Sequence, residues 1–117
     1  MRSLVVKVTA GDDAPERCLQ GLTVASVAAA SGAAVSLWLT GESVWLVTPG
    51  RDLALPKSPA ASSLLDGVLA AGTVTVCTQC AARRGLTQHD LVPGVRIAGA
   101  ASFVAEVLAD SAQALVY

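Results

Sequence analysis

Apolar residues follow two different spacings along the chain. Short runs rich in valine, leucine and threonine are typical of strands that are buried on both faces, and apolar residues at intervals of three or four are typical of helices with one buried side. The predicted strands are residues 3–9, 34–39, 73–77, 95–98 and 114–117. The predicted helices are residues 13–31, 59–71 and 78–84, followed by a last helix that contains residues 103–108.

Predicted strands and helices alternate along the whole chain. Parallel neighbouring strands need a crossover connection, and helices in these connections cover the two faces of the sheet. We therefore predict an α/β fold with a mostly parallel, five-stranded sheet and helices on both faces. At 117 residues the chain is long enough for one core and too short for two, so residues 1–117 are expected to form a single domain.

Local signals predict where several elements begin and end. Asp13 is expected to cap the first helix, with Glu16 reaching back in a capping box, and Gly32 is expected to end it. Residues 41–57 are the least regular part of the chain. Within them, residues 44–47 fit a single helical turn.

The composition is less polar than a monomer's surface normally requires. Apolar residues make up 53% of the chain and charged residues 15%, and the mean hydropathy is +0.58. Soluble domains usually carry roughly 25% charged residues. The shortage suggests that identical subunits cover part of the surface. A net charge of −1 and 3% aromatic residues indicate neither a nucleic-acid partner nor binding to an anionic membrane surface.

A membrane span deserves consideration because Gly21–Gly41 carries no charge and is long enough to cross a bilayer. Its alanine, serine, threonine and glycine residues contribute little transfer energy, Ser31 and Gly32 interrupt it, and a strand pattern follows. We therefore expect a soluble protein. Three cysteines, an odd number, argue against a disulfide scaffold, and the first seven residues do not form a secretory signal, so the expected compartment is the cytoplasm.

The strongest chemical signal is a cysteine at the junction of a strand and a helix. Cys77 ends the predicted strand 73–77, and a short helix starts at Thr78. A helix start presents unpaired N–H groups and the positive end of the dipole, which stabilise a thiolate and make it more reactive. In open parallel sheets, sites form at the carboxyl ends of the strands. Chemistry is therefore expected to start at Cys77.

Several of these elements together resemble a known family. The strand Ser3–Thr9, the turn Thr40–Val44, a strand that ends in Cys77 and is followed by Arg83–Gly85, and the segment Ile97–Ala100 occur in this order. With them, nearly the whole chain resembles the DsrE family, small sulfur-handling proteins also called DsrE/F-like or YchN-like. The spacing from Cys77 to Arg83–Gly85 is the most specific element of the resemblance.

The resemblance implies a compact α/β fold related to flavodoxin topology and assembly into trimers or hexamers. It also implies sulfur transfer through a persulfide on Cys77, between donor and acceptor proteins. One departure is Cys80, which gives this chain a C-x-x-C motif that the single-cysteine sulfur carriers of the family do not all share. Sulfur relay through Cys77, which would be a sulfurtransferase activity, is the leading functional hypothesis.

The residues after Cys77 have expected supporting roles. The backbone N–H groups expected to hold its charge are those of Thr78, Gln79 and Cys80. Two cations that follow, Arg83 and Arg84, are candidates for steering an anionic partner. Glu42 follows Gly41 at the carboxyl end of the second predicted strand. There it either lines the same cleft as Cys77 or caps the next turn.

Other interpretations of the same residues stay open. Cys77 can be a structural cysteine in a non-catalytic, oligomeric or small-ligand-binding module. Cys80 either forms a thiol redox pair with Cys77 or points at the sheet. The cysteines at 18, 77 and 80 and His89 suffice in number for zinc, but their spacing does not support a site, so no metal and no cofactor are expected. His89 is expected to be exposed in a short turn.

An apolar cluster in the irregular region is expected to contact other subunits. Trp45 and Val44 lie in this cluster, and aromatic residues are enriched in interface cores. We predict that they form an oligomer contact that also walls the cleft.

Overall fold

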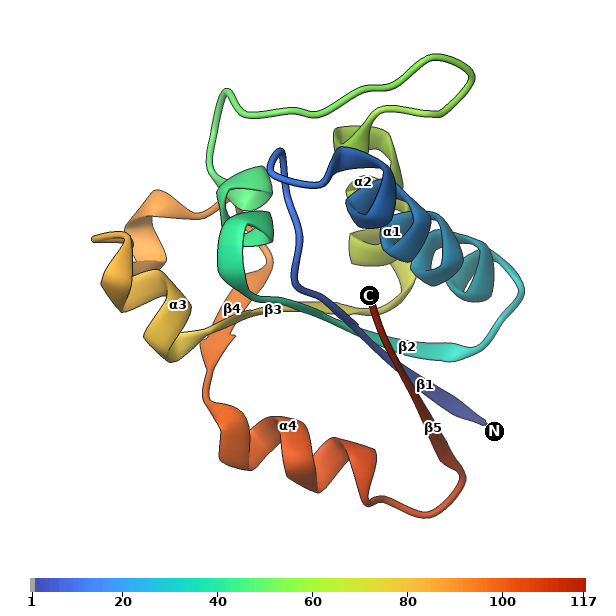
Figure 1. Cartoon of the computed structure of the whole chain (residues 1–117). Coiled ribbons are helices and arrows are strands. Elements are labelled where there is room, and N and C mark those ends of the chain that lie inside the picture. Colours follow the sequence, from blue (N-terminus) through green and yellow to red (C-terminus); the bar gives the residue numbers. More distant parts are fainter. Residues whose placement is uncertain (1) are drawn as a thin grey trace.

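Five strands form one parallel sheet in the order β4-β3-β2-β1-β5 (Figure 1). The computed structural model describes residues 2–117. The strands are β1 (Ser3–Val8), β2 (Ala34–Leu39), β3 (Thr73–Cys77), β4 (Val95–Ala98) and β5 (Ala112–Val116). The helices are α1 (Pro15–Ala30), α2 (Ala61–Ala71), α3 (Thr78–Arg83) and α4 (Ala100–Val107), with short 3₁₀ helices η1 (Gly41–Val47) and η2 (Gln88–Asp90). The predicted fold class and element order are confirmed.

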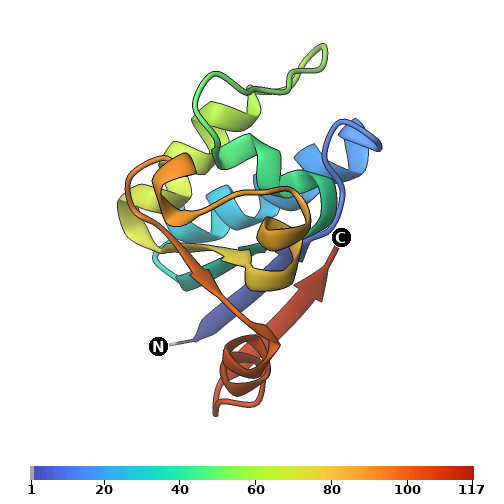
Figure 2. The same ribbon diagram turned by 90° about the vertical axis from the view of Figure 1, so that its left-hand side faces the viewer.

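The strand order explains which helix lies on which face. From β1 to β4 the chain steps across the sheet in one direction, so right-handed crossovers place α1 and α2 on the same face. The connection from β4 to β5 returns across the whole sheet in the opposite direction. Right-handedness therefore places α4 on the other face, where it lies apart from the other helices in both views (Figures 1 and 2).

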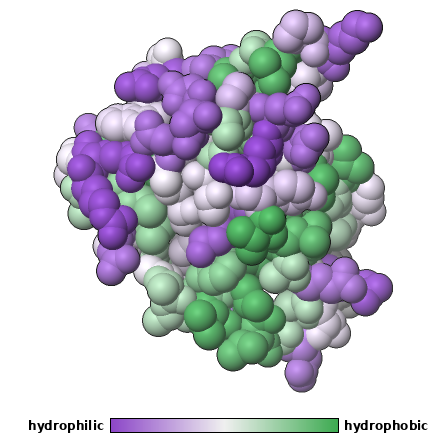
Figure 3. All heavy atoms as spheres, viewed as in Figure 1, coloured by the Kyte–Doolittle hydropathy of each residue, from purple (hydrophilic) through white to green (hydrophobic). Residues whose placement is uncertain are grey.

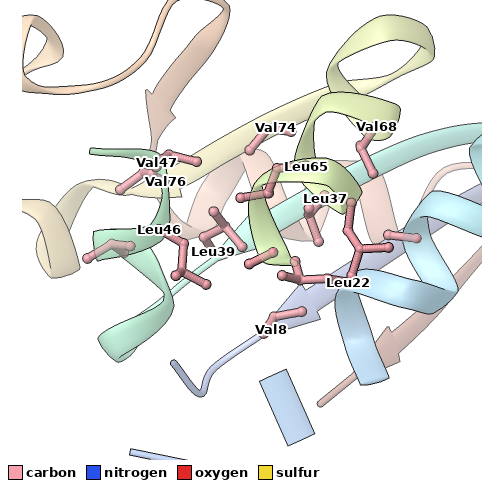
Figure 4. Packing of buried hydrophobic residues seen from close by; sticks show 14 of the residues in the cluster. Val8, Leu22, Leu37, Leu39, Leu46, Val47, Leu65, Val68, Val74 and Val76 are labelled. Carbon is pink, nitrogen blue, oxygen red and sulfur yellow. The ribbon is translucent and has the colours of Figure 1, made fainter. Parts of the chain in front are cut away.

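The main core lies between the sheet and the face that carries α1 and α2. Side chains on this face of neighbouring strands meet in register, as Val6 does with Leu37 and Leu37 with Val74. They pack against Leu22 of α1 and Val68 of α2, and all of these side chains are fully buried (Figure 4). Burying a valine or leucine side chain contributes about 1.5–3 kcal/mol. This packing holds the carboxyl ends of the strands in fixed positions.

The opposite face of the sheet, which we call the α4 face, is covered differently. Trp38 of β2 is 1% exposed there, and its ring meets the ring of Phe103 edge-on at 5.4 Å. The Trp38 Nε1–H donates to Glu106 Oε1 at 3.0 Å, and Glu106 Oε2 forms an ion pair with Arg96 of β4. The hydroxyl of Ser36 also donates to Glu106. One carboxylate thus ties α4 to two strands.

Three local expectations need correction. Glu16 does not form the expected capping box, because the start of α1 has no side-chain cap hydrogen bond. Asp13 does not cap α1, because the N-cap residue is Ala14 and the Asp13 carboxylate instead accepts a hydrogen bond from the Gly11 N–H at 2.8 Å. The tight turn before the helix uses the side chain that the helix start would need. The last strand begins at Ala112, earlier than the expected residue 114, because Ala112 already pairs with Ser3 in the register of β1 and β5.

The uncharged segment Gly21–Gly41 is divided between the end of α1, a turn and β2, as its internal signals predict. Within residues 2–117, the helices are too short or too polar to cross a bilayer.

Candidate functional site

Cys77 lies at the carboxyl edge of the sheet, where β3 passes directly into α3. It is the last residue of β3 and occupies the N-cap position of α3, with extended backbone angles (φ −65°, ψ 129°). Its register partner in β4 is Ala98, the last residue of that strand. The first turn of a helix has N–H groups without an intrahelical acceptor, so donors are available next to the Cys77 sulfur. The side chain is partly exposed.

The surroundings of Cys77 favour its thiolate. Partial burial raises the pKa of Cys77, but the backbone N–H groups of Cys80 and Gln79 bind the charged sulfur and lower it. The thiol of Cys80 and the positive charge of Lys7 lower it further, so the pKa lies below the ordinary value for cysteine. Hydrogen bonds to the charged form thus outweigh the cost of removing it from water.

Cys80 is buried and lies close to Cys77. Its sulfur accepts a hydrogen bond from the Gly41 N–H at 3.3 Å, and the side chain is 9% exposed. Gly41 has a φ of +58°, and a Cβ atom at this position would lie 2.6 Å from the Thr9 carbonyl oxygen. Only glycine suits this tight turn after β2. The turn therefore holds the second thiol in place beneath the first turn of α3.

Glu42 and Arg84 form an ion pair that links η1 to α3. Arg84 Nε donates to Glu42 Oε2 at 3.0 Å, and Arg84 Nη2 lies 2.9 Å from the same oxygen. Arg84 Nη1 also donates to the Cys80 carbonyl oxygen at 3.1 Å. The side chain of Glu42 thus neither caps a turn nor stands alone in a cleft. Glu42 thus neutralises Arg84. Arg83 is exposed to solvent and does not take part in this ion pair.

The other residues expected around Cys77 take distinct positions. Thr78 and Gln79 are exposed in the first turn of α3. The N–H groups that bind the sulfur are those of Gln79 and Cys80, two of the three that we expected.

The apolar cluster of η1 separates into a buried and a surface residue. Val44 is 0% exposed and belongs to the core of this chain, so it has no surface for a neighbouring subunit. Trp45 is partly buried, and the guanidinium of Arg51 lies 4.7 Å from the centre of its ring. Trp45 and Glu42 both line a small hollow at this end of the sheet. The expected contact of Trp45 with another subunit stays a prediction.

Cys18 and His89 lie away from this site. Cys18 is fully buried in α1, where burial, with the nearby charges of Asp13 and Asp12, raises its pKa to about 11. His89 is exposed in η2, as predicted. Across residues 2–117, histidine, cysteine and acidic side chains do not come together in a group of three or more that could bind a metal ion.

Sequence reasoning missed Lys7 as a neighbour of Cys77. The signal was a lysine in the middle of a strand that is otherwise apolar. Lys7 pairs in register with Trp38, and Trp38 with Thr75. Side chains alternate along a strand, so Cys77 shares the α4 face with Thr75 and Lys7. A hollow of about 600 Å³ between α1, residues 55–58 and Tyr117 contains none of the predicted site residues.

Comparisons with known proteins agree with this arrangement. A sequence profile of the DsrE/DsrF-like family matches residues 2–116. The fold is similar to the crystal structure of the YchN protein from E. coli, with a TM-score of 0.84, 19% identity and all of both chains covered. It is also similar to MTH1491 from Methanobacterium thermoautotrophicum, a protein of unknown function, with a TM-score of 0.75, 12% identity and full coverage of both chains. No curated protein matches the sequence.

Proposed function

Because this chain belongs to the DsrE/DsrF-like family, we propose that it carries sulfane sulfur as a persulfide on Cys77 and passes it to an acceptor thiol. The family supports a role connected with sulfur relay in general. The observation that carries the finer proposal is the partly exposed Cys77 thiol, whose pKa is lowered by N–H groups at the start of α3. A relay needs a thiolate that is both charged and reachable, and this position provides both.

The proposed transfer is a form of thiol–persulfide exchange. The Cys77 thiolate attacks the outer sulfur of a donor persulfide, forms a new S–S bond and releases the donor as a thiolate. An acceptor thiolate then attacks the outer sulfur on Cys77, takes it as a persulfide and leaves the Cys77 thiolate behind. Each step breaks one S–S bond and forms another, so no external oxidant or reductant is needed. The exposed Arg83 would attract an anionic donor or acceptor protein.

Sulfur loading tests this proposal. After incubation with a persulfide donor, the intact mass of the wild-type protein should increase by one sulfur atom. The increase should be absent in Cys77→Ser and persist in Cys80→Ser, which also changes a thiol in α3 and serves as the matched control. A wild-type protein that gains no sulfur, under conditions that load an unrelated sulfur carrier, would contradict the relay.

A second candidate function rests on the closeness of the two thiols in the C-x-x-C motif. The Cys80 thiol lies within hydrogen-bonding reach of the Cys77 sulfur, as a C-x-x-C redox pair requires. In the same mass measurement, such a pair would lose two hydrogen atoms on mild oxidation and regain them with a reductant. If the protein loses and regains these two hydrogen atoms and gains no sulfur, it is a thiol redox protein. If the mass shows neither change, the role of Cys77 is structural.

We further propose that Cys77 acts in the cytoplasm, because a reducing compartment keeps thiols free.

We further propose that the chain assembles with copies of itself. Val104, Leu108 and Val116 are 50%, 76% and 64% exposed, and we call them the α4–β5 surface. The region of α4 in the lower part of Figure 3 is strongly apolar. β5 is also an edge strand, paired only with β1. A second copy of a chain this poor in charge can cover such a surface without burying unpaired charges.

Leu108→Glu is expected to lower the mass measured by light scattering towards that of one chain, because a charge at this surface cannot be buried without a partner. Trp45→Ala is the matched variant on the opposite side of the sheet. A shift in Trp45→Ala alone would move the interface to η1, and a wild-type mass of one chain would contradict self-assembly.

A further inference from the structure

Lys7 and Cys77 lie on the same face of the sheet, at the strands that flank β2. The register brings Lys7 beside Trp38 and Trp38 beside Thr75, and Cys77 follows Thr75 on the same side of β3. β1 and β3 are two strand spacings apart, about 9.6 Å, and the long lysine side chain covers part of this distance on the face that carries Cys77. The charge of Lys7 acts on Cys77 and favours its thiolate.

An aromatic ring of α4 fixes the position of the Lys7 ammonium. Lys7 Nζ lies 4.5 Å from the centre of the Phe103 ring. Phe103 in turn meets the buried Trp38 edge-on, so the ring itself has little freedom to move. A cation–π contact attracts an ammonium group without neutralising its charge, unlike a contact with a carboxylate. The full positive charge of Lys7 is therefore retained at a fixed place.

Two other cations near Cys77 are already paired, and the exposed Arg83 lies at the far end of α3. On the α4 face, Arg96 of β4 forms an ion pair with Glu106 of α4. On the side of α3 and η1, Arg84 forms an ion pair with Glu42. In the part of the chain that the structure describes, no carboxylate forms an ion pair with Lys7. Lys7 is thus the cation facing Cys77 whose field is not cancelled by an acidic partner.

We propose that Lys7 is a positioning residue that keeps the sulfur of Cys77 anionic, with Phe103 holding the ammonium group in place. The proposal deepens the sulfur-carrier function and rests on it for its second part, the persulfide. The outer sulfur of a persulfide lies one S–S bond, about 2 Å, beyond the atom that the N–H groups of Gln79 and Cys80 hold. The Coulomb field of the Lys7 ammonium extends beyond hydrogen-bonding distance and still acts on this outer atom, whereas the N–H groups bind the inner one.

The test compares Lys7→Met with Lys7→Arg. The rate of alkylation of Cys77 by neutral iodoacetamide is measured against pH, with the modified cysteine identified by peptide mass. In Lys7→Met the pH profile of Cys77 should move to higher pH, and the rate at pH 7 should fall roughly three- to tenfold, because a smaller fraction of Cys77 is then a thiolate. Lys7→Arg keeps the charge and should retain most of the wild-type rate. An unchanged profile in Lys7→Met, or an equal loss in Lys7→Arg, overturns the proposal.

Two further measurements cover the case in which Lys7→Met fails to fold. Phe103→Leu keeps the lysine but removes the ring, and the rate should fall about twofold because the ammonium group is no longer held in place. In the wild type, raising the salt concentration from about 0.01 M to 1 M should slow alkylation, since salt screens the field of the partly exposed Lys7. Rates that do not change in either measurement overturn the role of Lys7.

Alkylation separates the two proposals because the reagent supplies no sulfur. If alkylation of Cys77 is slower in Lys7→Met and the wild type never gains sulfur, the role of Lys7 is kept and the sulfur-carrier proposal is overturned. If the wild type gains sulfur and the alkylation profile of Lys7→Met is unchanged, the sulfur-carrier proposal is kept and the role of Lys7 is overturned. In a wild type that gains sulfur, Lys7→Met should also hold the Cys77 persulfide for a shorter time than Lys7→Arg at equal pH.

Discussion

Neutral iodoacetamide is expected to modify Cys77 at least about a hundredfold faster than Cys18 in the native protein at pH 7. Burial, with the charges of Asp12 and Asp13, raises the pKa of Cys18 to about 11, so only about one Cys18 in ten thousand is a thiolate at this pH. The Cys18 side chain is also 0% exposed. For Cys77, the N–H groups of the first turn of α3 lower the pKa, and the side chain reaches solvent.

The pH dependence follows from these opposite shifts. The pKa of Cys77 lies below the ordinary value, so its alkylation rate should reach a plateau at lower pH than that of a free cysteine. Cys18 should stay unmodified over the same range and react only after the protein unfolds. Peptide mass spectrometry of samples quenched over time measures both rates in one experiment, with the unfolded protein in denaturant as the control. Similar native rates at the two cysteines would remove the argument for a reactive Cys77.

Glu106→Ala is expected to lower the free energy of unfolding by about 2–4 kcal/mol. The change leaves the buried Trp38 Nε1–H without its acceptor and Arg96 without its ionic partner. It also removes the polar contacts of Glu106 between α4 and the sheet, while the contact of Phe103 with Trp38 remains. Urea unfolding followed by Trp fluorescence measures the difference in unfolding free energy.

Two control variants separate the hydrogen bonds from the charge. Glu106→Gln keeps an oxygen that can accept from Trp38 and Ser36 but loses the charge, so it should cost about 1–2 kcal/mol. Asp110→Ala removes an exposed acid close to α4 and should change stability by less than about 0.5 kcal/mol. An equal, small effect of all three variants would contradict the role of Glu106.

Acid should reveal the same interaction in the wild type. Burial raises the pKa of Glu106, but the hydrogen bonds from Ser36, Trp38 and Arg96, together with the charge of Arg96, lower it more. A carboxylate with a lowered pKa stabilises the fold above its unfolded pKa of about 4.3, and the contribution is lost as the pH falls through the folded value. The wild type should therefore lose more stability than Glu106→Gln when the pH is lowered below about 4.

The positions of the strands and helices followed closely from local patterns. β3 (Thr73–Cys77) and β4 (Val95–Ala98) begin and end where the apolar runs do. The helix start after Cys77 could be identified because a buried strand is followed directly by residues with helical spacing. Asp13 was a wrong cap because a side chain with two local uses, a turn and a helix start, can serve only one of them.

The pairing of side chains could not be read from the chain in the same way. Glu42 and Arg84 meet because η1 and α3 both leave the carboxyl edge of neighbouring strands, β2 and β3. Val44 and Trp45 are neighbours in sequence, yet one is in the core and the other is at the surface. In a short 3₁₀ helix, adjacent side chains point in different directions, and only the packing of η1 on the sheet decides which of them is covered.

Local patterns along the chain were enough to predict the order of elements, the parallel sheet and the thiol at the start of a helix. These features depend on residues close to one another along the chain, whose spacing sets the burial of each face and the availability of N–H groups. Which charges reach that thiol became clear only from the folded arrangement of the sheet. Strand order and register bring Lys7 to the same face as Cys77 and pair Arg96 with Glu106, because contacts between distant segments depend on how the whole sheet packs.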